Sequence, residues 1–254
     1  MKNPIIRQIS VIIAVIATIA VNGLANALPL NNQSTGEISD RFQVFFVPAG
    51  YVFSIWGLIY IGLILFAIFQ ALPGQKENPH LIGTGYLFVL SCLANIAWLF
   101  LWHYEEFVLT LVAMFALLGL LVSIYLRLGI GKVKVSSSER WLVHVPFSVY
   151  LGWITVATIA NVTTTLNYLN WNGWGINPAI WAVIMMVISA VVAVIVLLTR
   201  NDIAYVLVII WALFGIGVKQ SNTSLVATSA NVLASLLLII MVAMVIRGVI
   251  KRKS

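Results

Sequence analysis

Charged residues are scarce in this sequence: of 254 residues, 8% are charged, whereas 62% are hydrophobic. Soluble domains carry about 25% charged residues, so this composition predicts a membrane-embedded protein. The net charge of +7 does not predict nucleic-acid binding, because the basic residues lie between or beyond the apolar runs. The single cysteine, Cys92, lies inside an apolar run and can form no internal disulfide.

Asp, Glu, Lys and Arg are also missing from deep within the apolar runs, where ion pumps and ion-coupled transporters usually keep ionisable residues. The sequence has no HExxH motif, no glycine-rich phosphate loop and no nucleophile with an obvious base partner. His80 and His103 lie at the ends of apolar runs, and His144 has no second histidine one helical turn later. We therefore expect no catalytic residue, no metal site and no required cofactor, and an enzyme is the less favoured class.

Apolar segments are what the sequence does contain, and we count eight. All except the seventh reach the ~20 residues that a membrane-spanning helix needs. The seventh holds 16 residues between Asp202 and Lys219, so it is either a short span or part of a re-entrant hairpin. The eight segments are residues 8–30, 48–71, 81–102, 107–128, 141–166, 178–199, 203–218 and 225–246.

The basic residues favour eight spans over seven. With eight spans and the amino terminus inside the cell, only Arg41 and Lys219 fall outside. A seven-span chain would move the four basic residues of the carboxyl terminus outside, against the positive-inside rule. The sequence therefore predicts an all-α bundle of eight transmembrane helices in the inner cell membrane, with both termini in the cytoplasm. The twelve inside residues are Lys2, Arg7, Lys76, Arg127, Lys132, Lys134, Arg140, Arg200, Arg247, Lys251, Arg252 and Lys253.

Three segments each combine large aromatic side chains on one helix face, and two of these faces also carry an amide. The faces consist of Phe53, Trp56 and Tyr60 in the second segment, Asn95, Trp98 and Trp102 in the third, and Trp153, Ala157 and Asn161 in the fifth. An unpaired amide in hydrocarbon is costly, so Asn95 and Asn161 must face other helices or a polar cavity. Two interpretations stay open: these residues join helices to one another, or they line an apolar pocket for a flat hydrophobic ligand.

These residues resemble motifs of the TspO/MBR family, the translocator or tryptophan-rich sensory proteins. Pro-Ala-Gly-Tyr-Val-Phe, which begins at Pro48, resembles the family's Pro-Pro-Gly-Trp-Val-Phe, and Trp-Gly-Leu-Ile-Tyr, from Trp56, resembles Trp-x-x-Leu-Tyr. Leu-Ala-Asn-Ile-Ala-Trp, which ends at Trp98, is similar to the third-helix Leu-x-Leu-Asn-x-x-Trp. Trp-Ile-Thr-Val-Ala-Thr-Ile-Ala-Asn, from Trp153 to Asn161, is similar to the fifth-helix Trp-x-x-Phe-Ala-Thr-x-Leu-Asn.

The resemblance implies a five-helix TspO-like bundle over residues 1–170, followed by a three-helix membrane extension over residues 171–254 that the family's usual bundle lacks. Family members bind porphyrins and related tetrapyrroles, and some bind sterols, in a pocket between the helices. The resemblance therefore implies that this chain binds a hydrophobic aromatic molecule, such as a porphyrin or haem, for sensing or transport. By the resemblance, the pocket would be lined by Trp56, Asn95, Trp98, Trp153, Ala157 and Asn161. Phe53 and Tyr60, which share a face with Trp56, complete the predicted ligand-binding set.

Two other functions stay open: a permease or transporter subunit for a small hydrophobic substrate, and an enzyme that degrades a bound porphyrin in light. The expected partners are the lipid bilayer and the ligand, with no nucleic acid, and a homodimer is left open. Lys2, Arg7 and the run Ala25-Asn26-Ala27 would also fit a cleaved signal peptide. We favour an uncleaved first helix, because the family that the chain resembles retains this helix.

Overall fold

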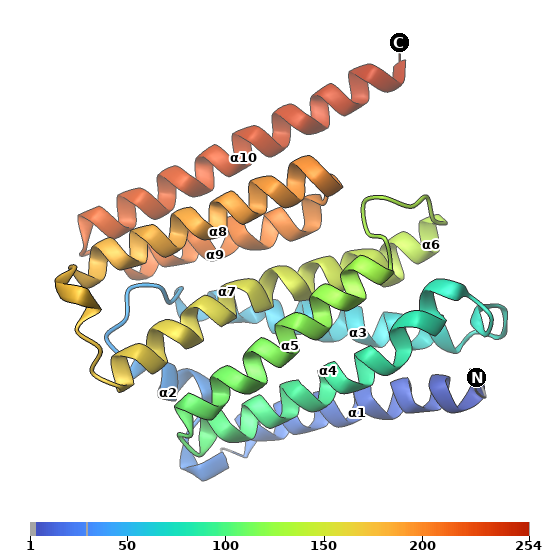
Figure 1. Cartoon of the computed structure of the whole chain (residues 1–254), viewed down its shortest axis with the longest axis horizontal. Helices are drawn as coiled ribbons and strands as arrows, with labels where there is room; N and C mark the ends of the chain where they lie inside the picture. The colour runs from blue at the N-terminus through green and yellow to red at the C-terminus, as the bar shows by residue number, and fades with distance from the viewer. Residues whose placement is uncertain (1–3, 29, 254) are drawn as a thin grey trace.

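The computed structural model describes residues 4–28 and 30–253, and every regular element in that part of the chain is a helix. The long helices run alongside one another in an up-and-down bundle (Figure 1). They are α1 (Pro4–Ala27), α3 (Ile55–Ala71), α4 (Pro79–His103), α5 (Phe107–Arg127), α7 (Val145–Tyr168), α8 (Pro178–Arg200), α9 (Ile203–Lys219) and α10 (Ser224–Lys253). The predicted all-α polytopic bundle is confirmed.

Short helical turns occupy the connections. The helix α2 (Thr35–Asp40) begins at a capping box, in which the Ser34 side chain accepts a hydrogen bond from the Glu37 N–H and the Glu37 carboxylate accepts one from the Ser34 N–H. Pro146, which has no N–H to donate, is the second residue of α7, just after the π-helical turn η4. The other short elements are η1 (Leu30–Asn32), η2 (Gly50–Ser54), η3 (Pro73–Gln75), α6 (Ser137–Glu139), η4 (Arg140–His144) and η5 (Gly173–Gly175).

Seven of the described helices are long and apolar enough to cross a membrane, and α9 is shorter, with 17 residues. Both α8 and α10 begin at the same end of the bundle (Figure 1). The chain between them must therefore run back along the bundle, and α9 is the element that does so. This arrangement argues against a re-entrant hairpin. The helices also match the eight predicted segments closely. The largest differences are the start of α3, at Ile55 against a predicted 48, and the end of α10, at Lys253 against a predicted 246.

The beginning of α1 and the end of α10 lie at one end of the bundle, which we call the terminal end (Figure 1). The connection between α3 and α4, which contains the predicted inside residue Lys76, lies at this end as well (Figure 1). Lys2, another of those residues, lies outside the described part of the chain. The side of the membrane that this end faces stays a prediction.

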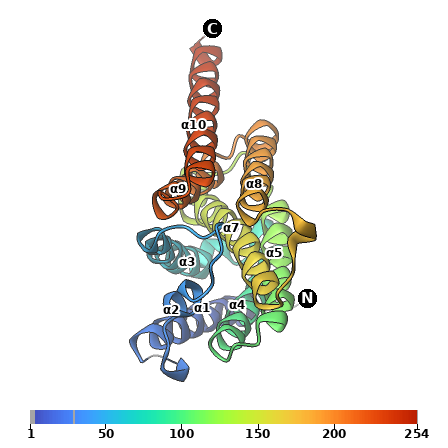
Figure 2. The ribbon, with the colours of Figure 1, turned by 90° about the vertical axis from the view of Figure 1, so that its left-hand side faces the viewer.

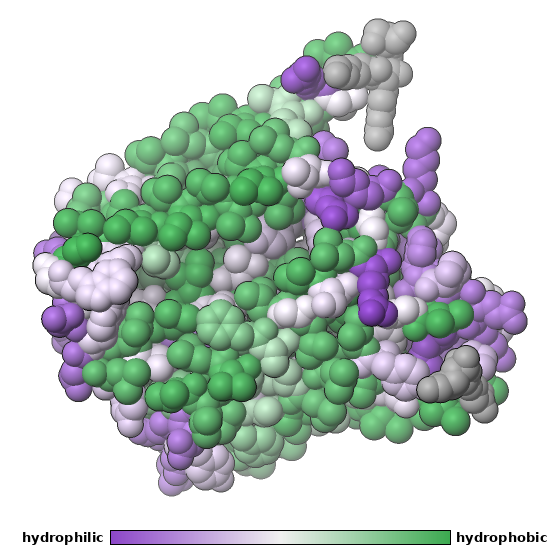
Figure 3. All heavy atoms as spheres, in the orientation of Figure 1, coloured by the Kyte–Doolittle hydropathy of each residue, from purple (hydrophilic) through white to green (hydrophobic). Residues whose placement is uncertain are grey.

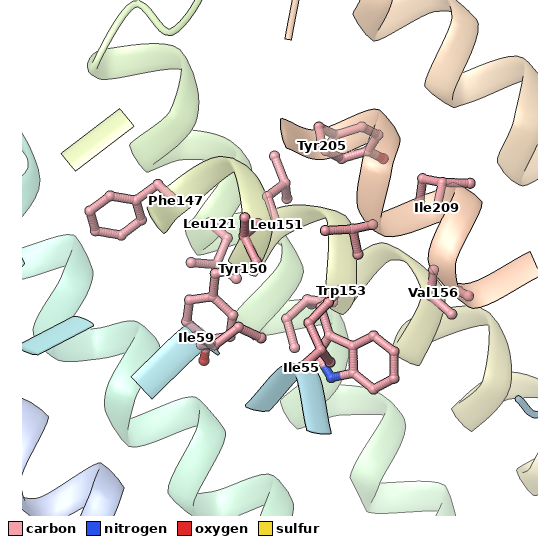
Figure 4. Close-up of a cluster of buried hydrophobic side chains, with 14 of the residues drawn as sticks. Ile55, Ile59, Leu121, Phe147, Tyr150, Leu151, Trp153, Val156, Tyr205 and Ile209 are labelled. Atoms are coloured by element: carbon pink, nitrogen blue, oxygen red, sulfur yellow. The ribbon is translucent and has the colours of Figure 1, made fainter. Parts of the chain in front are cut away.

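Helix α7 lies at the centre of the bundle, between α3, α5 and α9 (Figure 2), and it is the most deeply buried of the long helices. Figure 4 shows Tyr150 and Trp153 of α7 near Ile59 and Ile55 of α3, with α9 residues such as Tyr205 near the opposite face. The close approach of α9 favours a glycine in α7. A Cβ at Gly152 would lie 3.0 Å from Val208 Cβ and 3.1 Å from the Tyr205 carbonyl oxygen.

The start of α9 is tied to the bundle by a buried carboxylate. Asp202 accepts hydrogen bonds from the hydroxyls of Tyr125 in α5, at 2.8 Å, and Ser148 in α7, at 2.6 Å. It also accepts one from the backbone N–H of Tyr205, at 3.1 Å, and so caps α9. In addition to these hydrogen bonds, one hydrophobic core runs without interruption from α1 to α10.

The outward faces of the helices carry large exposed apolar side chains. Figure 3 shows these residues as a broad apolar surface, with polar residues gathered toward the two ends of the bundle. In water such a surface would be an aggregation hazard, whereas in a bilayer it is the surface that contacts lipid. The exposed residues thus support the membrane-embedded assignment that the composition predicts.

Candidate ligand-binding cavity

A cavity of about 70 Å³ lies among α3, α4, α5 and α7 and is bordered by residues 30–54, which we call the 30–54 segment. Seven of the eight predicted ligand-binding residues line it. They are Phe53, Trp56, Asn95, Trp98, Trp153, Ala157 and Asn161. The eighth, Tyr60, does not line the cavity, but its ring stacks on Trp56 with centroids 5.6 Å apart. The structure thus brings residues from three separate sequence motifs together around one space.

Aromatic rings form two clusters on the cavity wall. Trp153 packs edge-on against Phe53 and Trp56, with ring centroids 5.5 Å and 6.3 Å away. On α4, Trp98 and Trp102 stack with centroids 5.4 Å apart. These arrangements are the offset and edge-to-face geometries that aromatic pairs prefer. The wall is therefore mostly apolar and suited to contact with the faces and edges of an aromatic ligand.

The Asn95 amide lies on the cavity wall but is occupied by protein partners. Its oxygen accepts a hydrogen bond from the Asn22 amide of α1 at 2.8 Å, and its nitrogen donates to the Tyr150 hydroxyl of α7 at 3.3 Å. Asn95 thus joins three helices. A ligand would have to displace one of these bonds before it could use this amide.

The Asn161 amide is occupied in the same way. Its oxygen accepts a hydrogen bond from the indole N–H of Trp98 at 2.9 Å, and its nitrogen donates to the Thr110 hydroxyl of α5 at 2.8 Å. Both amides therefore join helices, as one of the two interpretations of the sequence proposes, and both also line the cavity, as the other proposes.

The indole N–H of Trp153 differs from these groups. The side chain is 2% exposed, and its Nε1 has no hydrogen-bond partner among the described residues. A buried donor without an acceptor costs about 1–3 kcal/mol relative to a paired one. Trp153 therefore lines the mostly apolar cavity and carries a buried hydrogen-bond donor that no described residue uses.

The 30–54 segment closes one side of the cavity. The indole of Trp102 donates to the carbonyl oxygen of Thr35 at 3.2 Å, and Arg41 forms an ion pair with Glu105 at 3.0 Å. Hydrogen bonds from Gln33 and Arg41 hold the pKa of the Glu105 carboxyl below its ordinary value. The carboxylate is therefore ionised at neutral pH and keeps the segment attached at the end of α4.

Several lining residues are absent from the set that the sequence predicts. Trp102 shares a helix face with Asn95 and Trp98, so helical spacing alone was enough to include it. Thr35 and Ser39 belong to α2, whose capping box is visible in the sequence as Ser34 followed by Glu37. The remaining eight comprise four residues of the motifs quoted above, such as Pro48 and Val156, and four with no distinguishing signal, such as Met114 and Leu117 of α5. They are Val47, Pro48, Met114, Leu117, Ile154, Val156, Ala160 and Thr164.

Comparison with known proteins gives one positive result. A family model described as TSPO-like protein matches residues 8–243. The chain belongs to the TSPO-like family. No curated protein and no solved structure gave a match.

The TSPO-like match extends past residue 170, through α8 and α9 and into α10. The predicted boundary between a five-helix bundle and a three-helix extension therefore lies inside the matched region. The continuous hydrophobic core crosses the same position. In this TSPO-like chain, α8, α9 and α10 are integral to one packed bundle.

The wall of the TSPO-like cavity supplies several kinds of group that bind a ligand. These are aromatic rings, two amides held by other side chains and the unused donor of Trp153. Within the described residues, no group of three His, Cys, Asp or Glu side chains is placed to hold a metal ion. The arrangement thus suits an apolar aromatic molecule that carries a hydrogen-bond acceptor.

Proposed function

We propose that this TSPO-like protein binds a hydrophobic aromatic molecule of the porphyrin or tetrapyrrole kind within the membrane, for sensing or transport. The observation that carries the proposal is the buried indole N–H of Trp153, which has no partner among the described residues of a mostly apolar cavity. A ligand with a carbonyl, carboxylate or aromatic nitrogen acceptor would satisfy this donor. Phe53 and Trp56 would contact its rings.

The size of the cavity sets a condition on binding. Pockets that enclose drug-sized ligands measure about 300–1,000 Å³, whereas this cavity measures about 70 Å³. A tetrapyrrole can therefore enter only if part of the wall moves, or if part of the ligand lies outside the cavity between helices. The 30–54 segment is the wall best placed to move, because it is a chain of short turns that side-chain contacts hold to the long helices.

A spectral titration of the purified protein with protoporphyrin IX and with haem tests the proposal. Saturable binding by the wild-type protein is the expected result. The informative variant is Trp153→Phe, which keeps an aromatic ring but removes the donor. Loss of one hydrogen bond costs about 0.5–1.5 kcal/mol, so affinity should fall about two- to twelvefold. The smaller ring also leaves a cavity that lowers the thermal stability of the unliganded protein, but no hydrogen bond is lost there, because the donor is unpaired.

A matched control is Trp174→Phe, since Trp174 is 75% exposed and lies outside the cavity lining. This variant should bind as the wild type does. Equal affinities for the Trp153 and Trp174 variants would remove the proposed role of the donor. A wild-type protein that binds neither protoporphyrin nor haem would refute tetrapyrrole binding.

A further inference from the structure

We propose that the end of α9 farthest from the termini holds the 30–54 segment in place at the mouth of the cavity, which is the side that this segment closes. No residue of α9 lines the cavity itself. The inference rests on the proposed function, in which this cavity is the ligand site. It assigns to the carboxyl-terminal helices a role in ligand access that the ligand-contacting residues alone do not reveal.

Four contacts join α9 and the residue after it to the 30–54 segment. At the tip, Lys219 Nζ lies 2.7 Å from Asp40 Oδ1, and the Gln220 amide donates to the Val44 carbonyl oxygen at 3.4 Å. Further along α9, the backbone N–H of Ala49 donates to the Gly215 carbonyl oxygen at 3.0 Å, and the Trp211 indole donates to the Val52 carbonyl oxygen at 3.3 Å. The contacts thus follow the segment over thirteen positions, from residue 40 to residue 52.

Gly215 makes this contact close. A Cβ at this position would lie 2.2 Å from Val52 Cγ2 and 3.1 Å from Pro48 Cβ, so no larger residue fits without movement of the segment. Pro48 lines the cavity, and Phe53, which follows Val52, lines it as well. The position of the α9 backbone therefore determines where two cavity-lining residues lie.

The opposite side of the segment is attached to the end of α4 through Thr35 and Arg41, which contact Trp102 and Glu105. The segment is thus held between α4 and α9, on either side of the cavity. Widening of the cavity for a larger ligand requires release from one of the two. Each attachment includes an exposed ion pair: the Asp40 side chain is 70% exposed at α9, and the Arg41 and Glu105 side chains are 44% and 40% exposed at α4. Exposed ion pairs contribute little stability, so the ion pair at α9 can open at low cost.

Cysteine labelling measures the mouth without any ligand. Ala160 is small and lines the cavity, so a cysteine there becomes the labelling site. The native Cys92 is only 3% exposed, so the wild-type protein measures the background reaction. In Ala160→Cys protein, reaction with a water-soluble maleimide reports how often the cavity opens. Adding Lys219→Gln should raise the labelling rate about two- to fivefold, the size expected of an exposed ion pair, whereas Lys219→Arg should leave it unchanged.

Asp40→Asn should raise the rate as Lys219→Gln does, and the double variant should label no faster than either single variant, because both remove the same contact. Equal labelling rates in all of these variants would overturn the inference. So would additive effects of Asp40→Asn and Lys219→Gln.

A second experiment measures protoporphyrin IX binding by a variant of Gly215. Gly215→Ala should weaken protoporphyrin binding at least about fivefold, because the added methyl displaces the segment that carries Pro48 and Phe53. Gly119→Ala, on α5, is the matched control, since a Cβ there meets nothing within 4 Å. Unchanged affinity in Gly215→Ala would overturn the inference. If the wild-type protein binds no protoporphyrin, the proposed function fails, and the labelling rates still decide whether α9 holds the mouth.

Discussion

The indole N–H of Trp98 donates to the amide oxygen of Asn161 at 2.9 Å, and this bond joins α4 to α7 at the wall of the cavity. The two residues come from separate sequence motifs and were both predicted to contact ligand. Their mutual bond shows that a residue can join helices and line a cavity at the same time. The two interpretations that the sequence left open are therefore not exclusive.

Loss of the Trp98 donor should destabilise the protein. Trp98→Phe removes the indole N–H that donates to the buried Asn161 oxygen. A buried acceptor left without a donor costs about 1–3 kcal/mol. We expect a lower thermal unfolding temperature in detergent, measured by circular dichroism. Trp141→Phe is the control, because Trp141 is 67% exposed. If both variants unfold at the same temperature as the wild type, the Trp98–Asn161 bond does not contribute to stability.

Removal of the Asp202 carboxylate should loosen α9. Asp202→Ala leaves the Tyr125 and Ser148 hydroxyls without their buried acceptor and removes the cap of α9, so we expect a loss of about 2–5 kcal/mol. Chemical unfolding in detergent measures the loss, and proteolysis between α8 and α9 should become faster. Glu77→Ala, at an exposed position, is the control. Wild-type stability in Asp202→Ala would contradict the assigned role.

Reporter fusions test the orientation in the membrane. Because twelve basic residues are predicted inside and two outside, fusions after Lys134 and after Ser254 should report the cytoplasm, and a fusion after Asn170 should report the exterior. An external carboxyl terminus would contradict the eight-span arrangement.

The sequence was sufficient to predict the long helices, since lipid exposure requires continuous apolar runs and charged residues mark their ends. It was also sufficient to place Asn95, Trp98, Trp153 and Asn161 on helix faces, because helical spacing fixes which residues lie together. These predictions depend on local pattern alone.

The close contact at Gly215 and the hydrogen-bond partners of the cavity residues could not be predicted, because they depend on contacts between distant parts of the chain. No local pattern distinguishes Gly215, which must lack a side chain because Val52 lies against it, from Gly119, which lies in open space. Helical spacing likewise could not show that the Asn95 amide is hydrogen-bonded to Asn22 and Tyr150. Nor could it show that the Trp153 indole N–H has no partner among the described residues. These properties follow from how the helices pack, which no single segment determines.

Filling the cavity tests the central claim most directly. Ala157→Leu adds three carbon atoms to the wall of a cavity of about 70 Å³, whereas Ala116→Leu adds the same atoms to an exposed position on α5. The measurement is the protoporphyrin IX affinity of the two variants, each first shown to unfold at the wild-type temperature. We predict that Ala157→Leu binds at least about tenfold more weakly and that Ala116→Leu binds as the wild type does. Wild-type affinity in a stably folded Ala157→Leu protein would show that the ligand binds elsewhere and would contradict the account.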